Sequence, residues 1–126
     1  MEKNTEFDVN ELINIIKHDV QFKNILNSNH IFINKSMTYG WWTVNLTVCD
    51  NNKEPLAEFQ IVPINEVYMA DFVTRTHDPD FKQFESYEDL RNFIIPLAEI
   101  NIEVNNSNIP YEVRLELVKK FNNILE

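Results

Sequence analysis

The spacing of apolar residues changes twice along the chain, and this change restricts the fold more than any other feature of the sequence. Between Val9 and Leu26 apolar residues recur every three or four positions, which is the spacing of one face of a helix. Between Ile31 and Thr74 they mostly alternate with polar residues, as in half-buried strands. The helical spacing returns after Ser86. The chain is therefore predicted to place a group of strands between helices.

Capping and turn residues predict where these elements lie. Asp8 followed three residues later by Glu11 predicts a helix start, and the apolar stripe extends that helix over residues 8–26. Ser86 and Pro110 predict two further helix starts, because serine caps helix N-termini and proline suits the first helical turn. The predicted strands cover residues 31–33, 42–48, 57–61 and 67–74.

Two prolines modify this outline. Pro63 has no N–H to give to a sheet, so it is predicted to end the third strand or to place it at a sheet edge. Pro96 lies well inside the second predicted helix and cannot donate to the carbonyl four residues back. We therefore expect Pro96 to kink or divide that helix.

The predicted fold class is α+β. One domain over residues 1–126 contains a four-stranded, mainly antiparallel sheet with one N-terminal and two C-terminal helices, in the order α-β-β-β-β-α-α. A chain of 126 residues, 44% of them hydrophobic, suits a single core.

The charge balance restricts the partners. Twenty acidic side chains against eleven basic ones give a net charge of -9, which opposes direct binding to nucleic acid or to an anionic membrane. A basic protein partner is favoured instead. No apolar run is long enough to span a bilayer, and the first ten residues lack the pattern of a secretory signal, so a cytoplasmic location is expected.

Motifs for catalysis or metal binding are weak. The pairs His18-Asp19 and His77-Asp78 are a feature of metal-dependent phosphohydrolases, but His30 is the only other histidine and Cys49 the only cysteine. With one glycine in the chain, a phosphate-cradling loop is excluded. We therefore predict no metal, no cofactor and no catalytic residues. Carboxylate pairs leave no distinctive signature, so an enzyme stays open as an alternative.

The tryptophan pair is the first candidate contact. Neighbouring residues on a strand face opposite sides, so Trp42 is predicted to share the core face with Val44, Leu46 and Val48, and Trp41 to lie on the other side. A large indole that lies outside the core is either covered by a helix or available to a partner. Trp41 is therefore a predicted partner-binding residue.

An acidic, aromatic stretch before the second helix is the main candidate site. Between Asp71 and Glu103 the sequence has eight acidic residues and three basic ones. Acidic residues in a first helical turn are ordinary, because the helix dipole stabilises them, and this structural explanation remains open. The functional alternative is a docking face for a basic groove. Its predicted members are Asp78, Asp80, Phe81, Phe84, Glu85, Tyr87, Glu88 and Asp89.

These features favour a small acidic protein that binds another protein and is not an enzyme. We expect an inhibitor that blocks either a nucleic-acid-processing defence enzyme, as anti-restriction proteins of phages do, or a toxin, as immunity proteins do. The element order is similar to that of some small acidic anti-CRISPR proteins, and this resemblance implies the occupation of a DNA-binding groove. The alternatives are an enzyme or ligand-binding domain with a pocket between sheet and helices, and an adaptor subunit of a larger assembly.

Overall fold

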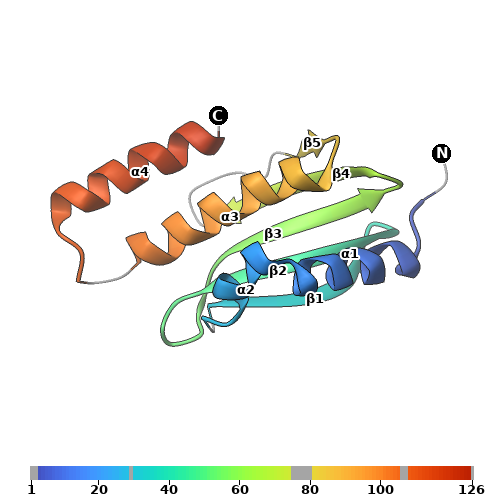
Figure 1. Ribbon diagram of the computed structural model, residues 1–126, viewed down its shortest axis with the longest axis horizontal. Coiled ribbons are helices and arrows are strands. Elements are labelled where there is room, and N and C mark those ends of the chain that lie inside the picture. The colour runs from blue at the N-terminus through green and yellow to red at the C-terminus, as the bar shows by residue number, and fades with distance from the viewer. Residues whose placement is uncertain (1–2, 29, 75–80, 106–107, 126) are drawn as a thin grey trace.

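The computed structural model describes residues 3–28, 30–74, 81–105 and 108–125, and it contains one five-stranded sheet with helices beside it (Figure 1). The sheet is antiparallel throughout, in the order β1-β2-β3-β4-β5. Its strands are β1 (Ile31–Thr38), β2 (Trp41–Cys49), β3 (Pro55–Ile64), β4 (Val67–Thr74) and β5 (Lys82–Phe84). The helices are α1 (Glu6–His18), α2 (Val20–Leu26), α3 (Tyr87–Val104) and α4 (Tyr111–Leu125).

The α+β class and the antiparallel sheet are confirmed, with one strand more than the four predicted. β5 has three residues, paired with β4 from Tyr68↔Phe84 to Ala70↔Lys82. A strand of this length shows no measurable alternation, so the sequence pattern did not reveal it.

The predicted continuous helix over residues 8–26 is wrong, because the chain breaks at Asp19. This residue ends α1 in an extended conformation and also caps α2, with its Oδ1 accepting from the Gln21 N–H at 2.9 Å. An aspartate that competes for a backbone N–H favours a cap over a helix interior. The apolar stripe nevertheless continues across the break, since Ile16, Phe22 and Ile25 are all buried.

Pro63 lies in a central strand, which corrects the prediction of a strand end or sheet edge. It pairs with Tyr68 of β4, while the ladder to β2 begins at Val44↔Ile61. The side chain of Asn4 connects the strands where that ladder is missing. Its Nδ2 donates to the carbonyls of Trp42 and Pro63, both at 2.8 Å, and its Oδ1 accepts from the Trp42 N–H at 2.9 Å. An amide side chain therefore replaces the backbone donor that proline lacks.

Pro96 does not divide α3, which remains helical from Tyr87 to Val104. The neighbouring side chains Ile94, Leu97 and Ala98 are fully buried. Their burial stabilises the helix by more than the hydrogen bond that the proline removes.

The core lies between the helices and one face of the sheet. It includes the stacked rings of Phe59 and Phe72, with centroids 4.4 Å apart, and Phe93 of α3. Val44, Leu46 and Val48 are fully buried there and Trp42 packs against them, so the predicted facing of β2 is confirmed.

Candidate functional site

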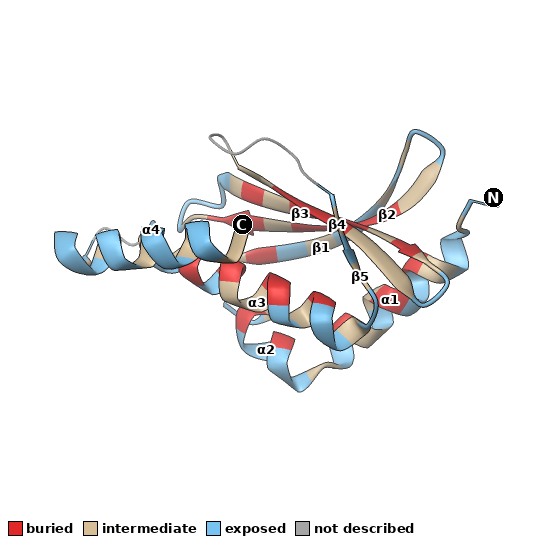
Figure 2. Cartoon of the chain, turned by 90° about the horizontal axis from the view of Figure 1, so that it is seen from above, coloured by how far each residue is buried: buried red, intermediate tan, exposed pale blue. Residues whose placement is uncertain are grey.

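One face of the sheet carries no helix among the described residues. Figure 2 shows the helices gathered on one side of the strands and none on the other. The other side is open only in part, because Thr43, Asn45 and Asp71 point to it and are buried. Because side chains alternate along a strand, the residues next to each buried core residue point to this open side. We call it the uncovered face. Its central members are Asn34 and Ser36 of β1, Trp41, Thr43 and Asn45 of β2, Glu58, Gln60 and Val62 of β3, and Met69, Asp71 and Val73 of β4.

A row of polar side chains crosses the middle of the uncovered face. Asn34, Asn45, Gln60 and Asp71 are direct cross-strand neighbours through four consecutive strands. Asn45 Nδ2 donates to Ser36 Oγ at 2.6 Å. This hydrogen bond holds Asn45, in the middle of the row, in a fixed position.

Asp71 is the unusual member of the row, since its side chain is 2% exposed and its Oδ1 has no hydrogen-bond partner. Burial raises the pKa of the Asp71 carboxyl above its ordinary value despite a hydrogen bond from the Gln60 N–H, and the Glu58 carboxylate adds to the rise. Because a buried carboxylate with one oxygen unpaired is costly, Asp71 does not contribute to stability in its charged form.

The substitution Asp71→Asn tests whether the charged carboxylate at this position fails to stabilise the fold. A carboxyl whose pKa is raised by folding stabilises the folded state below its unfolded pKa, and this stabilisation is lost as the pH rises through the folded pKa. Relative to wild type, Asp71→Asn is therefore expected to have a larger free energy of unfolding at neutral pH than at about pH 4. Urea unfolding of both proteins at the two pH values measures this difference. A difference independent of pH would show that Asp71 titrates as it does in the unfolded chain.

The uncovered face is acidic. Glu58 and Asp71 lie on it, and none of the described strand residues that point to this side is lysine or arginine. Lys35 and Lys82 project to the helical side, where Lys35 Nζ contacts Glu6 Oε1 at 2.8 Å and Lys82 Nζ donates to the Leu125 carbonyl at 2.6 Å. Asp71 is buried, so the partly exposed Glu58 carboxylate is the group on these strands that would attract a cationic surface. The ammonium of Lys3, beside Trp41, is a positive charge at the end of the same face.

Trp41 lies on the uncovered face, opposite Trp42, as the alternation predicted. Its ring is partly exposed, and the ammonium of Lys3 lies 5.9 Å from the ring centroid. The same ammonium donates to the Tyr39 carbonyl at 3.2 Å. The N-terminal segment thus contacts the indole without burying it.

The predicted acidic stretch leads from the edge of this sheet into α3. We call residues 81–89 the acidic corner. Glu85, Glu88 and Asp89 are exposed there, as is Phe81 at 48%. Ser86 caps α3, with its Oγ accepting from the Asp89 N–H at 3.1 Å. The structure therefore brings three predicted carboxylates and one aromatic side chain together beside β5, while Asp78 and Asp80 lie outside the described residues.

Phe84 and Tyr87 take part in the packing of the protein itself. Phe84 contacts Phe93, with ring centroids 5.0 Å apart. Tyr87 packs against the core, and its hydroxyl donates to Asp19 Oδ2 at 2.6 Å. Of the three aromatic residues predicted to contact a partner at this corner, Phe81 alone is exposed.

Asp19 joins the acidic corner to the break between α1 and α2. Its Oδ2 also accepts from Arg91 Nη1 at 3.2 Å. Burial opposes the charged carboxylate, but the hydrogen bonds from Tyr87, Gln21 and Arg91 hold the pKa of Asp19 below its ordinary value. Burial and the Asp19 carboxylate together raise the pKa of Tyr87. The corner is therefore fixed to the helical layer by a charged network.

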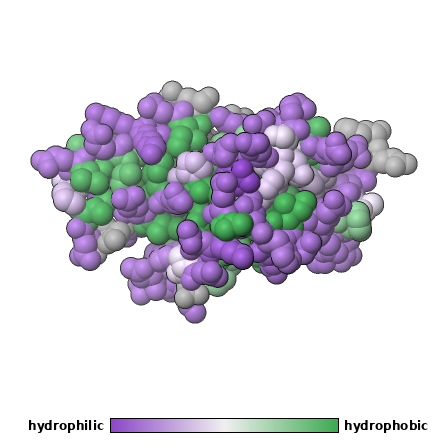
Figure 3. All heavy atoms as spheres, in the orientation of Figure 1, coloured by the Kyte–Doolittle hydropathy of each residue, from purple (hydrophilic) through white to green (hydrophobic). Residues whose placement is uncertain are grey.

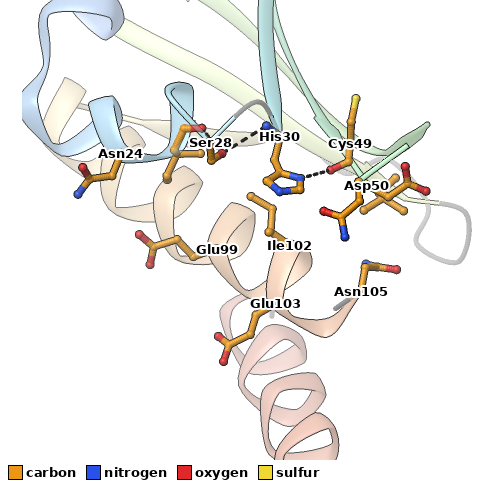
Figure 4. A pocket seen from close by; sticks show the side chains of 12 residues that line it. Asn24, Ser28, His30, Cys49, Asp50, Glu99, Ile102, Glu103 and Asn105 are labelled. Carbon is orange, nitrogen blue, oxygen red and sulfur yellow. Dashed lines mark hydrogen bonds between the residues drawn. The ribbon is translucent and has the colours of Figure 1, made fainter. Parts of the chain in front are cut away.

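A second candidate site is a pocket at the far end of α3, which sequence reasoning missed. It has a volume of about 390 Å³ and lies between the end of α2, the start of β1, the β2–β3 turn and the C-terminal half of α3 (Figure 4). Its polar lining comprises Asn24, Ser28, His30, Asp50, Asn51, Glu99, Glu103 and Asn105. These residues are far apart in the sequence and follow no motif, so no local signal could have joined them.

His30 is held in one tautomer in this pocket. Its Nδ1 lies 3.0 Å from the Cys49 carbonyl, which can only accept, so Nδ1 carries the proton and Nε2 accepts in the neutral ring. Burial raises the pKa of the Cys49 thiol, and neighbouring Asp50 and Glu54 add to the rise. A thiol in this environment is a poor nucleophile.

Among the described residues, no group of three or more histidine, cysteine, aspartate or glutamate side chains is arranged to hold a metal ion. No helix in the described ranges is both long and apolar enough to cross a membrane. No family model matches the chain, and comparisons with curated proteins and with solved structures found no similar protein.

Proposed function

We propose that this chain binds a basic protein and blocks its functional groove. The observation that carries the proposal is the uncovered face, a sheet surface with the partly exposed Glu58 carboxylate, a partly exposed indole and no basic side chain on its described strands. An antiparallel sheet commonly packs one face against the core and exposes polar residues on the other face. Trp41, Val62 and Met69 make this face more apolar than a solvated face requires, which favours contact with a partner.

The acidic corner lies at the edge of the sheet, where β5 leads into α3. Its exposed Glu85, Glu88 and Asp89 supply charge that speeds the approach of a basic partner. Basic grooves of this kind occur on enzymes that process nucleic acid and on nuclease toxins. We therefore propose an inhibitor of one of these two protein classes, since the net charge of -9 opposes nucleic acid itself as the partner.

Affinity capture from a host lysate tests the proposal with three baits. The first is the wild type, and the second carries Glu58→Lys and Gln60→Lys at the centre of the uncovered face. The third carries Glu99→Lys and Glu103→Lys, which are exposed positions at the other end of α3. We expect a basic protein to be retained by the wild type and the third bait and lost from the second. Equal retention by all three baits, or an acidic captured protein, would contradict the proposal.

A small-molecule binding function is the second candidate, favoured by the pocket around His30. The lining has three carboxylates and, among its described residues, no lysine or arginine, so an amine with a short aliphatic part fits its charge. Titration with butylamine and agmatine, followed by NMR, would separate the two candidates. Saturable shifts at His30 and Ile102 that disappear in Glu99→Gln would favour this second function.

A further inference from the structure

α4 is the least buried helix of the described chain, and none of its residues is fully buried. Its inward side packs through Phe121, whose ring lies 5.6 Å from that of Phe72 in β4, and through Ile124 and Leu125. Figure 1 places it at the margin of the molecule, beside α3. Most of its surface is therefore open to another molecule.

A second apolar stripe runs along α4 at the border of this packing, where Val118 lies beside Phe121 and one heptad before the packed Leu125. Tyr111, Leu115 and Val118 are 73%, 43% and 39% exposed, and they follow one another at spacings of four and three residues. That spacing places them on one line along the helix, like the core positions of a coiled coil. Figure 3 shows hydrophobic residues gathered over α4 and the adjoining part of α3. A helix with one apolar side packed and another left in water fits a further helical partner.

The charges beside the stripe indicate which partner. Glu112 directly follows Tyr111, and Lys119 directly follows Val118, so both flank the stripe on the same side. In an antiparallel pair centred between Leu115 and Val118, Glu112 of each copy lies within about one turn of Lys119 of the other. In a parallel pair, Glu112 of one copy lies about two turns from Lys119 of the other, on the opposite edge of the seam, so the two do not meet. The sequence of α4 is therefore complementary to itself in the antiparallel direction.

We propose that α4 pairs with α4 of a second copy of this chain in an antiparallel, two-fold arrangement. The stripe supplies the contact, and the two Glu112–Lys119 pairs set the direction. One helix of 15 residues forms a small interface, and two chains of charge -9 repel each other, so the dimer depends on protein concentration. This surface is separate from the uncovered face, and the inference does not depend on the proposed function.

Charge exchange tests both the pairing and its direction. Analytical ultracentrifugation of the wild type, up to about 0.5 mM, is expected to show a rise in average mass towards the dimer. Glu112→Lys alone and Lys119→Glu alone each bring like charges together, so each variant is expected to dimerise at least tenfold more weakly. Their equimolar mixture is expected to recover wild-type association, because each variant then offers the charge that the other lacks. Leu115→Ser is expected to remain monomeric with unchanged circular dichroism.

Recovery in the mixture distinguishes pairing from misfolding, since two misfolded variants would not restore each other. A wild type that stays monomeric throughout the concentration range would overturn the inference. So would dimers that neither the two charge variants nor Leu115→Ser weaken, because the contact would then lie elsewhere.

Discussion

Replacing Asp19 by alanine is expected to lower the free energy of unfolding at neutral pH by about 3–5 kcal/mol. The variant loses the cap of α2 and leaves Arg91 without its acceptor at a site where the two side chains are 19% and 10% exposed. Asp19→Asn keeps an oxygen for the Gln21 N–H, so about half of this loss is expected. Tyr87→Phe removes one hydroxyl and is expected to cost about 1 kcal/mol.

The loss at Asp19 has a defined pH dependence. Its pKa is lowered by folding, so its contribution is present above the unfolded pKa and disappears as the pH falls through the folded pKa. The urea unfolding curves of wild type and Asp19→Asn should therefore converge in acid. If Asp19→Asn matches wild type in stability at neutral pH, the network does not fix the corner to the helices.

The second large effect concerns the rate of binding. Reversing Glu85 and Glu88 to lysine is expected to slow association with the captured partner about tenfold at low salt and to flatten its dependence on salt. Both side chains are exposed, so the melting temperature should stay nearly constant. Surface plasmon resonance at two salt concentrations measures these rates.

Reversing Glu99 and Glu103 to lysine is the matched control, because it changes the net charge by the same amount at the other end of α3. It should slow association much less. Equal slowing by both double reversals would mean that net charge alone steers the partner, and that the acidic corner has no special position in the complex.

Alternation along β2 was sufficient to predict which of its residues enter the core. Val44, Leu46 and Val48 followed from period two alone, and so did the opposite facing of Trp41 and Trp42. Alternation does not say whether helices cover one side of the sheet or both. The uncovered face was therefore not predicted, although its polar row of Asn34, Asn45, Gln60 and Asp71 is present in the sequence.

Contacts between distant residues account for what the sequence did not predict. Asn4 replaces the donor missing at Pro63, which lies 59 positions away, and no local pattern marks such a pair. The sequence shows Tyr87 as an aromatic residue near acidic ones. Its hydroxyl bonds to Asp19, 68 positions earlier, so the side chain helps to hold the fold together and is not an exposed contact residue. Ser86 caps the start of α3, so the predicted carboxylates of the corner are not used as caps and remain exposed.

Carboxyl footprinting of the complex tests the proposed binding surface most directly. Exposed carboxylates are labelled with glycine ethyl ester in the free protein and in the complex, and the modified residues are read by mass spectrometry. Glu58, Glu85, Glu88 and Asp89 are predicted to lose labelling in the complex, while Glu99 and Glu103 keep it. Unchanged labelling of the first four residues, with protection of Glu99 and Glu103, would place the partner at the other end of α3 and contradict binding through the uncovered face and the acidic corner.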